Sequence, residues 1–89
     1  MKQENFYNAI QELETKKEIE QFLTLTFTEK ELAMMQERWS IFEGLSKGLS
    51  QRAIAQENNC SVVTVTRGAK AYRKNEETVE KYLKILSQD

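Results

Sequence analysis

The sequence predicts an all-α fold, and three features of the chain favour it. Proline is absent and only three glycines interrupt the 89 residues, so little in the chain breaks helical structure. Apolar residues recur three and four positions apart over most of the length, which is the spacing of one helix face. Ser, Thr or Asn precedes several of these segments, as at helix amino termini. We therefore expect short helices joined by polar turns, within a single domain covering residues 1–89.

The amino-terminal half is expected to form three helices. Thr15 followed by Glu18 fits a capping box that opens the second helix, and Thr28 followed by Glu31 fits another that opens the third. The third helix should end near Gly48. The apolar stripes of the three helices are, in order, Phe6, Ile10 and Leu13; Ile19, Phe22 and Leu23; and Leu32, Met35, Trp39, Phe42 and Leu45.

The carboxyl half is expected to form three further helices. Ser50 is a candidate cap for a short helix that ends near Asn59, a residue type that tolerates the left-handed conformation of a tight turn. Ser61 is a candidate cap for the next helix, and Asn75 for the last one. The apolar stripe of the last helix is Val79, Tyr82, Leu83 and Leu86.

The segment SVVTVT, which starts at Ser61, has the β-branched composition of a strand. Its longer-range spacing is instead that of a helix, which favours a helix over 62–74. A helix would bury one stripe and leave Val63, Thr64 and Arg67 on other faces. The stripe consists of Val62, Val65, Ala69 and Tyr72.

Length and composition limit the classes of protein. A domain of this size buries only about 60 to 65% of its unfolded surface, and hydrophobic residues make up 39% of the chain, so we expect an obligate homodimer with a shared core. Neither a membrane-spanning run nor a signal peptide is recognisable, which favours a cytoplasmic protein. One cysteine, Cys60, and no histidine argue against a disulfide, a metal site, a cofactor and the commonest catalytic pairings. We therefore expect that the protein is not an enzyme.

Charge is unevenly distributed along the chain. Residues 1–37 carry four Lys and eight Glu, a net charge of −4, and residues 75–89 carry a net charge of −2. The middle segment, 38–74, has a net charge of +5. Such a concentration of basic charge is typical of a surface that meets phosphates, although an unevenly charged solvated surface would also fit. Its basic residues are Arg38, Lys47, Arg52, Arg67, Lys70, Arg73 and Lys74.

Residues 50–68, SQRAIAQENNCSVVTVTRG, have the pattern of a helix-turn-helix: a short helix, a tight turn and a second, exposed helix. The small Ala55 permits a close crossing, while Ile54, Val62 and Val65 would fill the space between the helices. The residues expected to face base edges in the major groove of double-stranded DNA are Val63, Thr64 and Thr66. Gln51 and Arg52 would reach phosphates or a base edge, and Lys70, Arg73 and Lys74 would contact the backbone.

Within this segment the chain resembles the tryptophan repressor family. The resemblance rests on SQR at 50–52 and T-x-TRG at 64–68, with support from FLTLTFTEKELA, from Arg38 and from the last amphipathic helix. It implies six helices in an intertwined homodimer that binds palindromic operator DNA when L-tryptophan is bound as corepressor.

The resemblance also implies a ligand site. Arg38 and Arg67 would sandwich the indole ring of tryptophan, since a guanidinium stacks on an aromatic face and can pair with a carboxylate. The ligand's ammonium group would meet the backbone around Leu25 and Phe27, together with Thr28. Phe42 would form a wall, and Gly68 would leave room for the ligand.

Three positions depart from the family pattern. Ala71 replaces a serine that can bind the ligand's ammonium group, Glu29 replaces a proline, and the stretch between Gly48 and Ser50 is one residue shorter. These departures leave two alternatives open. One is a relative that binds DNA independently of tryptophan or with another effector, and the other is a helical protein-interaction module in which the arginines and lysines are ordinary surface charges.

Overall fold

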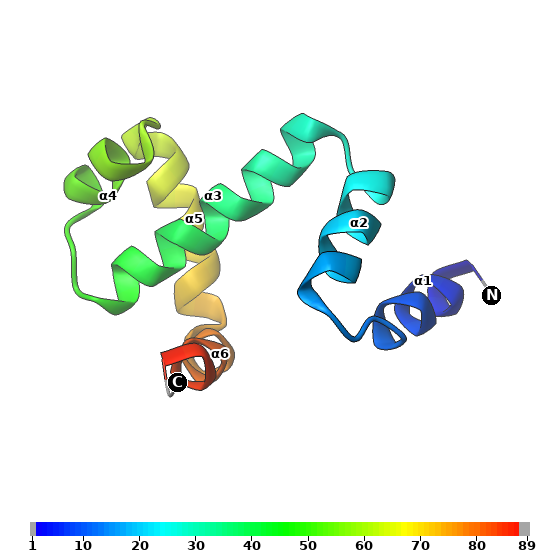
Figure 1. Cartoon of the computed structure of the whole chain (residues 1–89). Coiled ribbons are helices and arrows are strands. Elements are labelled where there is room, and N and C mark those ends of the chain that lie inside the picture. Colours follow the sequence, from blue (N-terminus) through cyan, green and yellow to red (C-terminus); the bar gives the residue numbers. More distant parts are fainter. Residues whose placement is uncertain (1, 88–89) are drawn as a thin grey trace. The chain divides into compact units, whose positions relative to one another are not determined.

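The computed structural model describes residues 2–87, and these residues form helices and no strands, which confirms the predicted all-α class. Figure 1 shows the helices in chain order. They separate into two compact units, one ending at Met34 and the other beginning at Met35. The six helices are α1 (Lys2–Gln11), α2 (Lys16–Thr26), α3 (Glu29–Ser46), α4 (Gln51–Asn58), α5 (Val62–Lys74) and α6 (Glu76–Ser87).

Both predicted capping boxes are present. At the start of α2 the Thr15 hydroxyl accepts from the Glu18 amide at 3.1 Å, and the Glu18 carboxylate accepts from the Thr15 amide at 3.2 Å. At the start of α3 the corresponding bonds between Thr28 and Glu31 measure 3.1 and 2.9 Å. Each pair satisfies backbone donors that a helix leaves unpaired at its first turn, which is why these helices begin where they do.

Helices α3 and α4 end in the same way. Gly48 follows α3 with a φ of 80°, and Asn59 follows α4 with a φ of 52° and a ψ of 46°. In each case the next amide bonds five residues back: Leu49 to the Gly44 carbonyl at 3.1 Å, and Cys60 to the Ala55 carbonyl at 3.0 Å. This is the Schellman pattern, in which a left-handed residue turns the chain back across the last turn of the helix.

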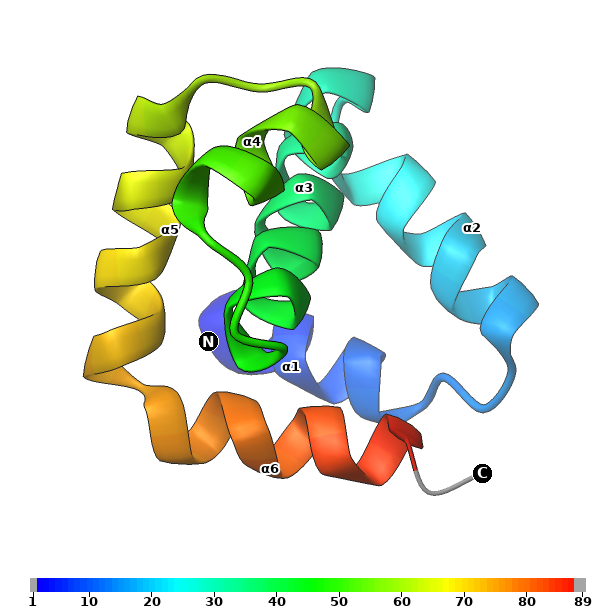
Figure 2. The same cartoon turned by 90° about the vertical axis from the view of Figure 1, so that its left-hand side faces the viewer.

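The carboxy-terminal unit contains the buried core. Its centre is the contact of α3, α4 and α5, where Ile41, Ile54, Ala55 and Val65 form one cluster, and Figures 1 and 2 show α4 and α5 side by side in this unit. Both helices also approach α3 closely: a Cβ added at Gly44 of α3 would lie 2.8 Å from Ile54 Cγ1 of α4, and one added at Gly68 of α5 would lie 2.9 Å from Ile41 Cγ2 of α3. Leu45 and Cys60 pack against the cluster from its edge, and Ala69 and Val79 are buried as well.

Two expectations about this core were wrong. Val62, the first residue of α5, is 47% exposed. The most buried side chain of α3 is Ile41, which lies outside the predicted stripe, whereas Met35 of that stripe is 55% exposed. The reason is that α3 is apolar on more than one face, and the face that packs against α4 and α5 carries Ile41 and Gly44.

Asn75 precedes α6 as predicted, but its side chain does not cap that helix. The Asn75 carbonyl does accept the first bond of α6, from the Val79 amide at 2.9 Å. Its side chain instead donates to the Ala71 carbonyl at 3.0 Å and so completes the end of α5. A capping side chain needs an extended backbone, and Asn75 has a φ of −130° and a ψ of 27°.

The amino-terminal unit has no buried side chain within residues 3–34. Its helices α1 and α2 meet through aromatic rings, with the Phe6 and Phe22 centroids 5.7 Å apart. Phe6 and Ile10 are each 40% exposed, so the apolar faces of these helices remain largely uncovered in one chain. Among the described residues, none of the helices is long and apolar enough to cross a membrane.

Candidate nucleic-acid interface

Helices α4 and α5 are joined by a three-residue turn, 59–61, at the place predicted from the sequence. Ile54, Ala55 and Val65 are buried where the two helices meet. The small side chain of Ala55 and the left-handed turn at Asn59 allow this close crossing. Ser61 caps α5 by accepting from the Thr64 amide at 3.1 Å, which settles the strand-like segment as helix.

A threonine hydroxyl of α5 is hydrogen-bonded to the first residue of α4. The Thr66 hydroxyl donates to the Gln51 side-chain oxygen at 2.8 Å and lies 2.9 Å from the Val62 carbonyl oxygen. The Thr64 hydroxyl lies 3.0 Å from that of Ser61. The Thr66 hydroxyl therefore ties α5 to the start of α4, whereas the Thr64 hydroxyl belongs to the cap of α5 itself. Val63, Thr64 and Thr66 of α5 are the residues predicted to face the bases, and we call them the reading surface. Bonds such as that of Thr66 fix the geometry of this surface before DNA is present.

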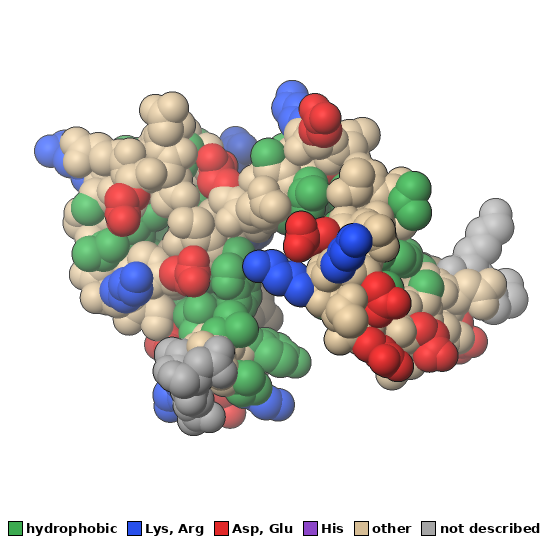
Figure 3. Space-filling model, viewed as in Figure 1, with side chains coloured by type: hydrophobic (Ala, Val, Ile, Leu, Met, Phe, Trp, Pro, Cys, Tyr) green, Lys and Arg blue, Asp and Glu red, His purple; other side chains and the backbone are tan. Residues whose placement is uncertain are grey.

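The other predicted DNA residues lie on the exposed parts of the same two helices. Val63 is 60% exposed in the first turn of α5. Gln51 and Thr64 are half-buried, whereas Arg52, Thr66, Lys70, Arg73 and Lys74 are exposed. Arg73 and Lys74 occupy the last turn of α5, where they also complement the negative end of the helix dipole. Figure 3 shows acidic side chains gathered over the amino-terminal helices, in agreement with the charge division along the sequence.

The predicted ligand residues divide between the two units. Arg38 and Arg67 are exposed on α3 and α5 of the carboxy-terminal unit. Leu25, 85% exposed near the end of α2, lies in the amino-terminal unit. Phe27 follows that helix and donates its amide to the Leu23 carbonyl at 2.9 Å, and Thr28 caps α3.

Phe42 and Gly68 have packing roles in the carboxy-terminal unit. The Phe42 ring lies between two other aromatic rings, 6.0 Å from Trp39 and 6.1 Å from Tyr72 by centroid. Gly68 is buried beneath Ile41, so a larger residue there would disturb the contact of α5 with α3. These contacts set how closely the two helices that carry Arg38 and Arg67 approach one another.

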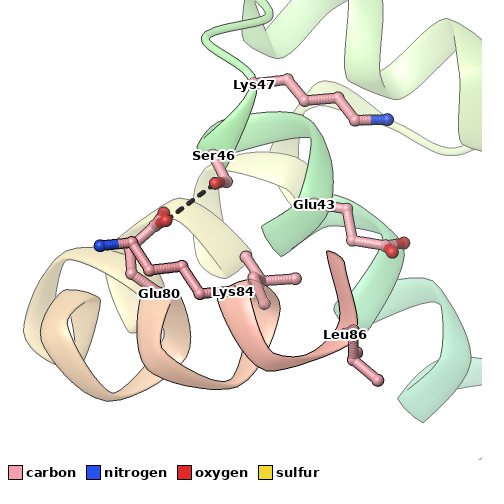
Figure 4. Close-up of a pocket in the computed structure, with 7 residues that line it drawn as sticks. Glu43, Ser46, Lys47, Glu80, Lys84 and Leu86 are labelled. Carbon is pink, nitrogen blue, oxygen red and sulfur yellow. Dashed lines mark hydrogen bonds between the residues drawn. The ribbon is translucent and has the colours of Figure 1, made fainter. Parts of the chain in front are cut away.

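Sequence reasoning missed one polar cluster in this unit, formed by Ser46 of α3, Tyr72 of α5 and Glu80 of α6. One Glu80 oxygen accepts from the Ser46 hydroxyl at 3.0 Å and the other accepts from the Tyr72 hydroxyl. Figure 4 shows Ser46 and Glu80 pointing toward one another at the wall of a cavity of about 330 Å³. Nothing in the local sequence marks this cluster, because Ser46 and Glu80 stand 34 positions apart.

The remaining chemistry of the described residues is limited. They contain no group of three or more His, Cys, Asp or Glu residues that could hold a metal ion. Burial raises the pKa of the Cys60 thiol, and the negative charge of Glu37 raises it further. Because a thiol must ionise to act as a nucleophile or metal ligand, Cys60 is suited to packing.

A short helix, a left-handed turn and a capped second helix with an exposed first turn together define a helix-turn-helix unit. The chain also matches the protein-family model described as Trp repressor protein over residues 2–87, and it belongs to that family. It is accordingly a DNA-binding transcriptional repressor by family, of a regulatory rather than an enzymatic kind. Comparisons with curated proteins and with solved structures found no match.

Proposed function

We propose that this protein is a tryptophan-responsive transcriptional repressor of the cytoplasm. A homodimer binds palindromic operator DNA through its two helix-turn-helix units when L-tryptophan is bound as corepressor. The observation that carries the proposal is the helix-turn-helix formed by α4 and α5 in a chain that belongs to the Trp repressor family. The exposed basic residues of the same two helices support it, because phosphate contacts supply much of the affinity for DNA.

The corepressor site is proposed around Arg38 and Arg67. Both side chains are exposed, and they project from the two helices that Ile41 and Gly68 bring into close contact. Two guanidinium groups on neighbouring helices suit an aromatic amino acid, whose ring can stack while its carboxylate accepts paired hydrogen bonds. A ligand held by both helices would fix the angle of α5, and the reading surface lies on α5.

The homodimer is supported by what one chain leaves uncovered. No side chain of residues 3–34 is buried, and the exposed large apolar residues come from both units. A chain of this length gains little stability from a core of six hydrophobic residues, the number buried in the part of the chain that the structure describes. A second copy would cover much of this apolar surface, which includes Leu25 and Met34 in one unit and Ile85 and Leu86 in the other.

Calorimetric titration with L-tryptophan tests the proposal directly. Wild-type protein should bind about one ligand per subunit, and Arg67→Ala or Arg38→Ala should abolish the heat of binding by removing one face of the sandwich. The matched control is Arg52→Ala, an exposed arginine of α4, which should bind tryptophan normally but bind duplex DNA more weakly. Normal tryptophan binding by the Arg67 and Arg38 variants would show that the site is wrongly placed.

A second candidate, DNA binding governed by another effector or by none, is favoured by two observations. Ala71 offers no hydroxyl to a ligand's ammonium group, and the stretch between Gly48 and Ser50 is one residue shorter than the family pattern. Duplexes selected from a randomised pool by the protein, with and without L-tryptophan, decide between the two. Equal retention of the selected duplex in both conditions would favour this second candidate.

A further inference from the structure

The polar cluster of Ser46, Tyr72 and Glu80 joins three helices through one carboxylate. Glu80, half-buried on α6, accepts one hydrogen bond from α3 and another from α5. Both donors are neutral hydroxyls and the acceptor is ionised, so the bonds belong to the stronger, charge-assisted kind. The cluster therefore restrains the carboxyl end of α5 more firmly than apolar packing alone would.

The ionisation of the two main partners agrees with this geometry. The hydrogen bonds from Tyr72 and from Ser46 lower the pKa of Glu80, against the opposing effect of burial, and the positive charge of Lys84 lowers it further. The hydrogen bond to Glu80, burial and the charge of Glu80 raise the pKa of Tyr72 to about 12. At neutral pH the phenol is thus a full donor and the carboxylate a full acceptor.

Tyr72 lies near the carboxyl end of α5, so its bond to Glu80 acts on the orientation of that helix. The amino half of α5 is fixed by the buried Val65 and by the bond between Thr66 and Gln51. Tyr72 lies seven residues beyond Val65, about 10 Å further along the helix axis. It is held twice there, through its ring on Phe42 and its hydroxyl on Glu80. Gly68 and Ala69 are buried between Val65 and Tyr72, so the contacts of Tyr72 restrain the part of α5 that lies beyond its buried stretch.

We infer that Glu80 is a positioning residue for DNA recognition: through Tyr72 and Ser46 it sets the tilt of α5, and so the angle at which the reading surface meets the major groove. The inference rests on the proposed DNA-binding role of α5. It assigns no direct DNA contact to Tyr72, Ser46 or Glu80. Their effect is on the fit to a specific site, and general attraction to phosphates should not depend on them.

The test compares Tyr72→Phe, which removes one hydroxyl and keeps the ring on Phe42, with the matched control Tyr82→Phe on the exposed side of α6. The probe is the duplex that wild-type protein selects from a randomised pool in the presence of L-tryptophan. Tyr72→Phe should weaken binding to it by about five-fold or more, because α5 then loses one of the two contacts that hold Tyr72 in place. Affinity for an unselected duplex, its salt dependence and the Tyr82→Phe control should stay unchanged.

A readout independent of DNA checks the contact itself. The absorbance titration of tyrosinate should contain a component near pH 12 in the wild type, because the pKa of Tyr72 is raised to about 12. Tyr72→Phe should remove that component and Glu80→Gln should move it to lower pH. If the wild type lacks this component, the hydrogen bond between Tyr72 and Glu80 is not formed and the inference is wrong. If the contact is present, unchanged affinity of Tyr72→Phe for the selected duplex would overturn the positioning role.

If the protein does not bind DNA at all, these experiments give a different set of results. If wild-type protein retains no duplex from the pool, the positioning role falls with the DNA-binding role, while the tyrosinate component still reports the contact. A loss of affinity that Tyr72→Phe shows equally on selected and unselected duplexes would also contradict the inference, because it would indicate general unfolding of the unit. Thermal unfolding of both variants, monitored by helical circular dichroism, identifies that case.

Discussion

Asn59 is, among the described residues other than glycine, the one with a positive φ. A side chain with a Cβ costs about 1 to 2 kcal/mol in this conformation, although Asn tolerates it better than most. Asn59→Ala should therefore lower the free energy of unfolding by about 1 kcal/mol, and Asn59→Gly should leave it unchanged or raise it slightly. Urea unfolding of the two variants measures the difference. Equal stability of both would mean that the turn relaxes in the alanine variant.

Glu80 should make the protein's stability depend on pH in the acid range. Its pKa is lowered in the folded state by the bonds from Tyr72 and Ser46. Its contribution is therefore present above the pKa of the unfolded chain and is lost as the pH falls through the folded pKa. Glu80→Gln should flatten this part of the profile, as should Tyr72→Phe. Urea unfolding from neutral to acid pH checks both variants, and unaltered profiles would show that the bonds contribute nothing.

Helices α3 and α5 approach each other closely where Gly68 meets Ile41. A Cβ at Gly68 would lie 2.9 Å from Ile41 Cγ2, and both residues are buried. Gly68→Ala should lower the free energy of unfolding by about 1 to 3 kcal/mol, as overpacking commonly does. Ile41→Leu removes the branch at Cβ, so the double variant should be more stable than the sum of the two single effects predicts. Strict additivity in urea unfolding would exclude a direct clash.

The helix boundaries could be predicted from the sequence because capping is a local property. Thr15, Thr28, Ser50 and Ser61 act within three residues of their partners, and a single pass along the chain finds them. The left-handed Asn59 was predicted for the same reason. The cap predicted at Asn75 was wrong, because its side chain can bond either to the amides of the helix that follows or to a carbonyl of the helix that precedes it. It donates to the Ala71 carbonyl.

Packing between helices could be predicted only in part. In α3 the apolar residues cover more than one face, so periodicity could not decide that Ile41 would be the buried one. The bonds of Glu80 with Ser46 and Tyr72 depend on three helix axes that the sequence does not specify. The expected exposure of Val63 in the first turn of α5 is confirmed, and its contact with DNA stays a prediction. Whether Arg38 and Arg67 hold tryptophan stays a prediction.

A repressor of the proposed kind requires two copies of the chain in a fixed arrangement. Residues 3–34 bury no side chain of their own, so their apolar faces can contribute stability only against another surface. Unfolding should therefore depend on protein concentration, with a higher melting temperature at higher concentration, as expected for a coupled dimer. Sedimentation equilibrium gives the number of chains directly. A monomer with a concentration-independent melting temperature would contradict the homodimer.

A dimer with two rigidly held reading units should measure the distance between half-sites. Two successive major grooves on one face of DNA lie about 34 Å apart, and each added base pair also turns the second half-site by about 35°. Inserting two base pairs at the centre of the selected duplex should therefore weaken binding at least ten-fold, since only one unit can then engage its half-site fully. A duplex with the same central bases substituted but not lengthened is the control. If the lengthened duplex is bound as tightly as the original, the two helix-turn-helix units bind DNA independently. A ligand that fixes the angle of α5 could then not act through the spacing of the two units.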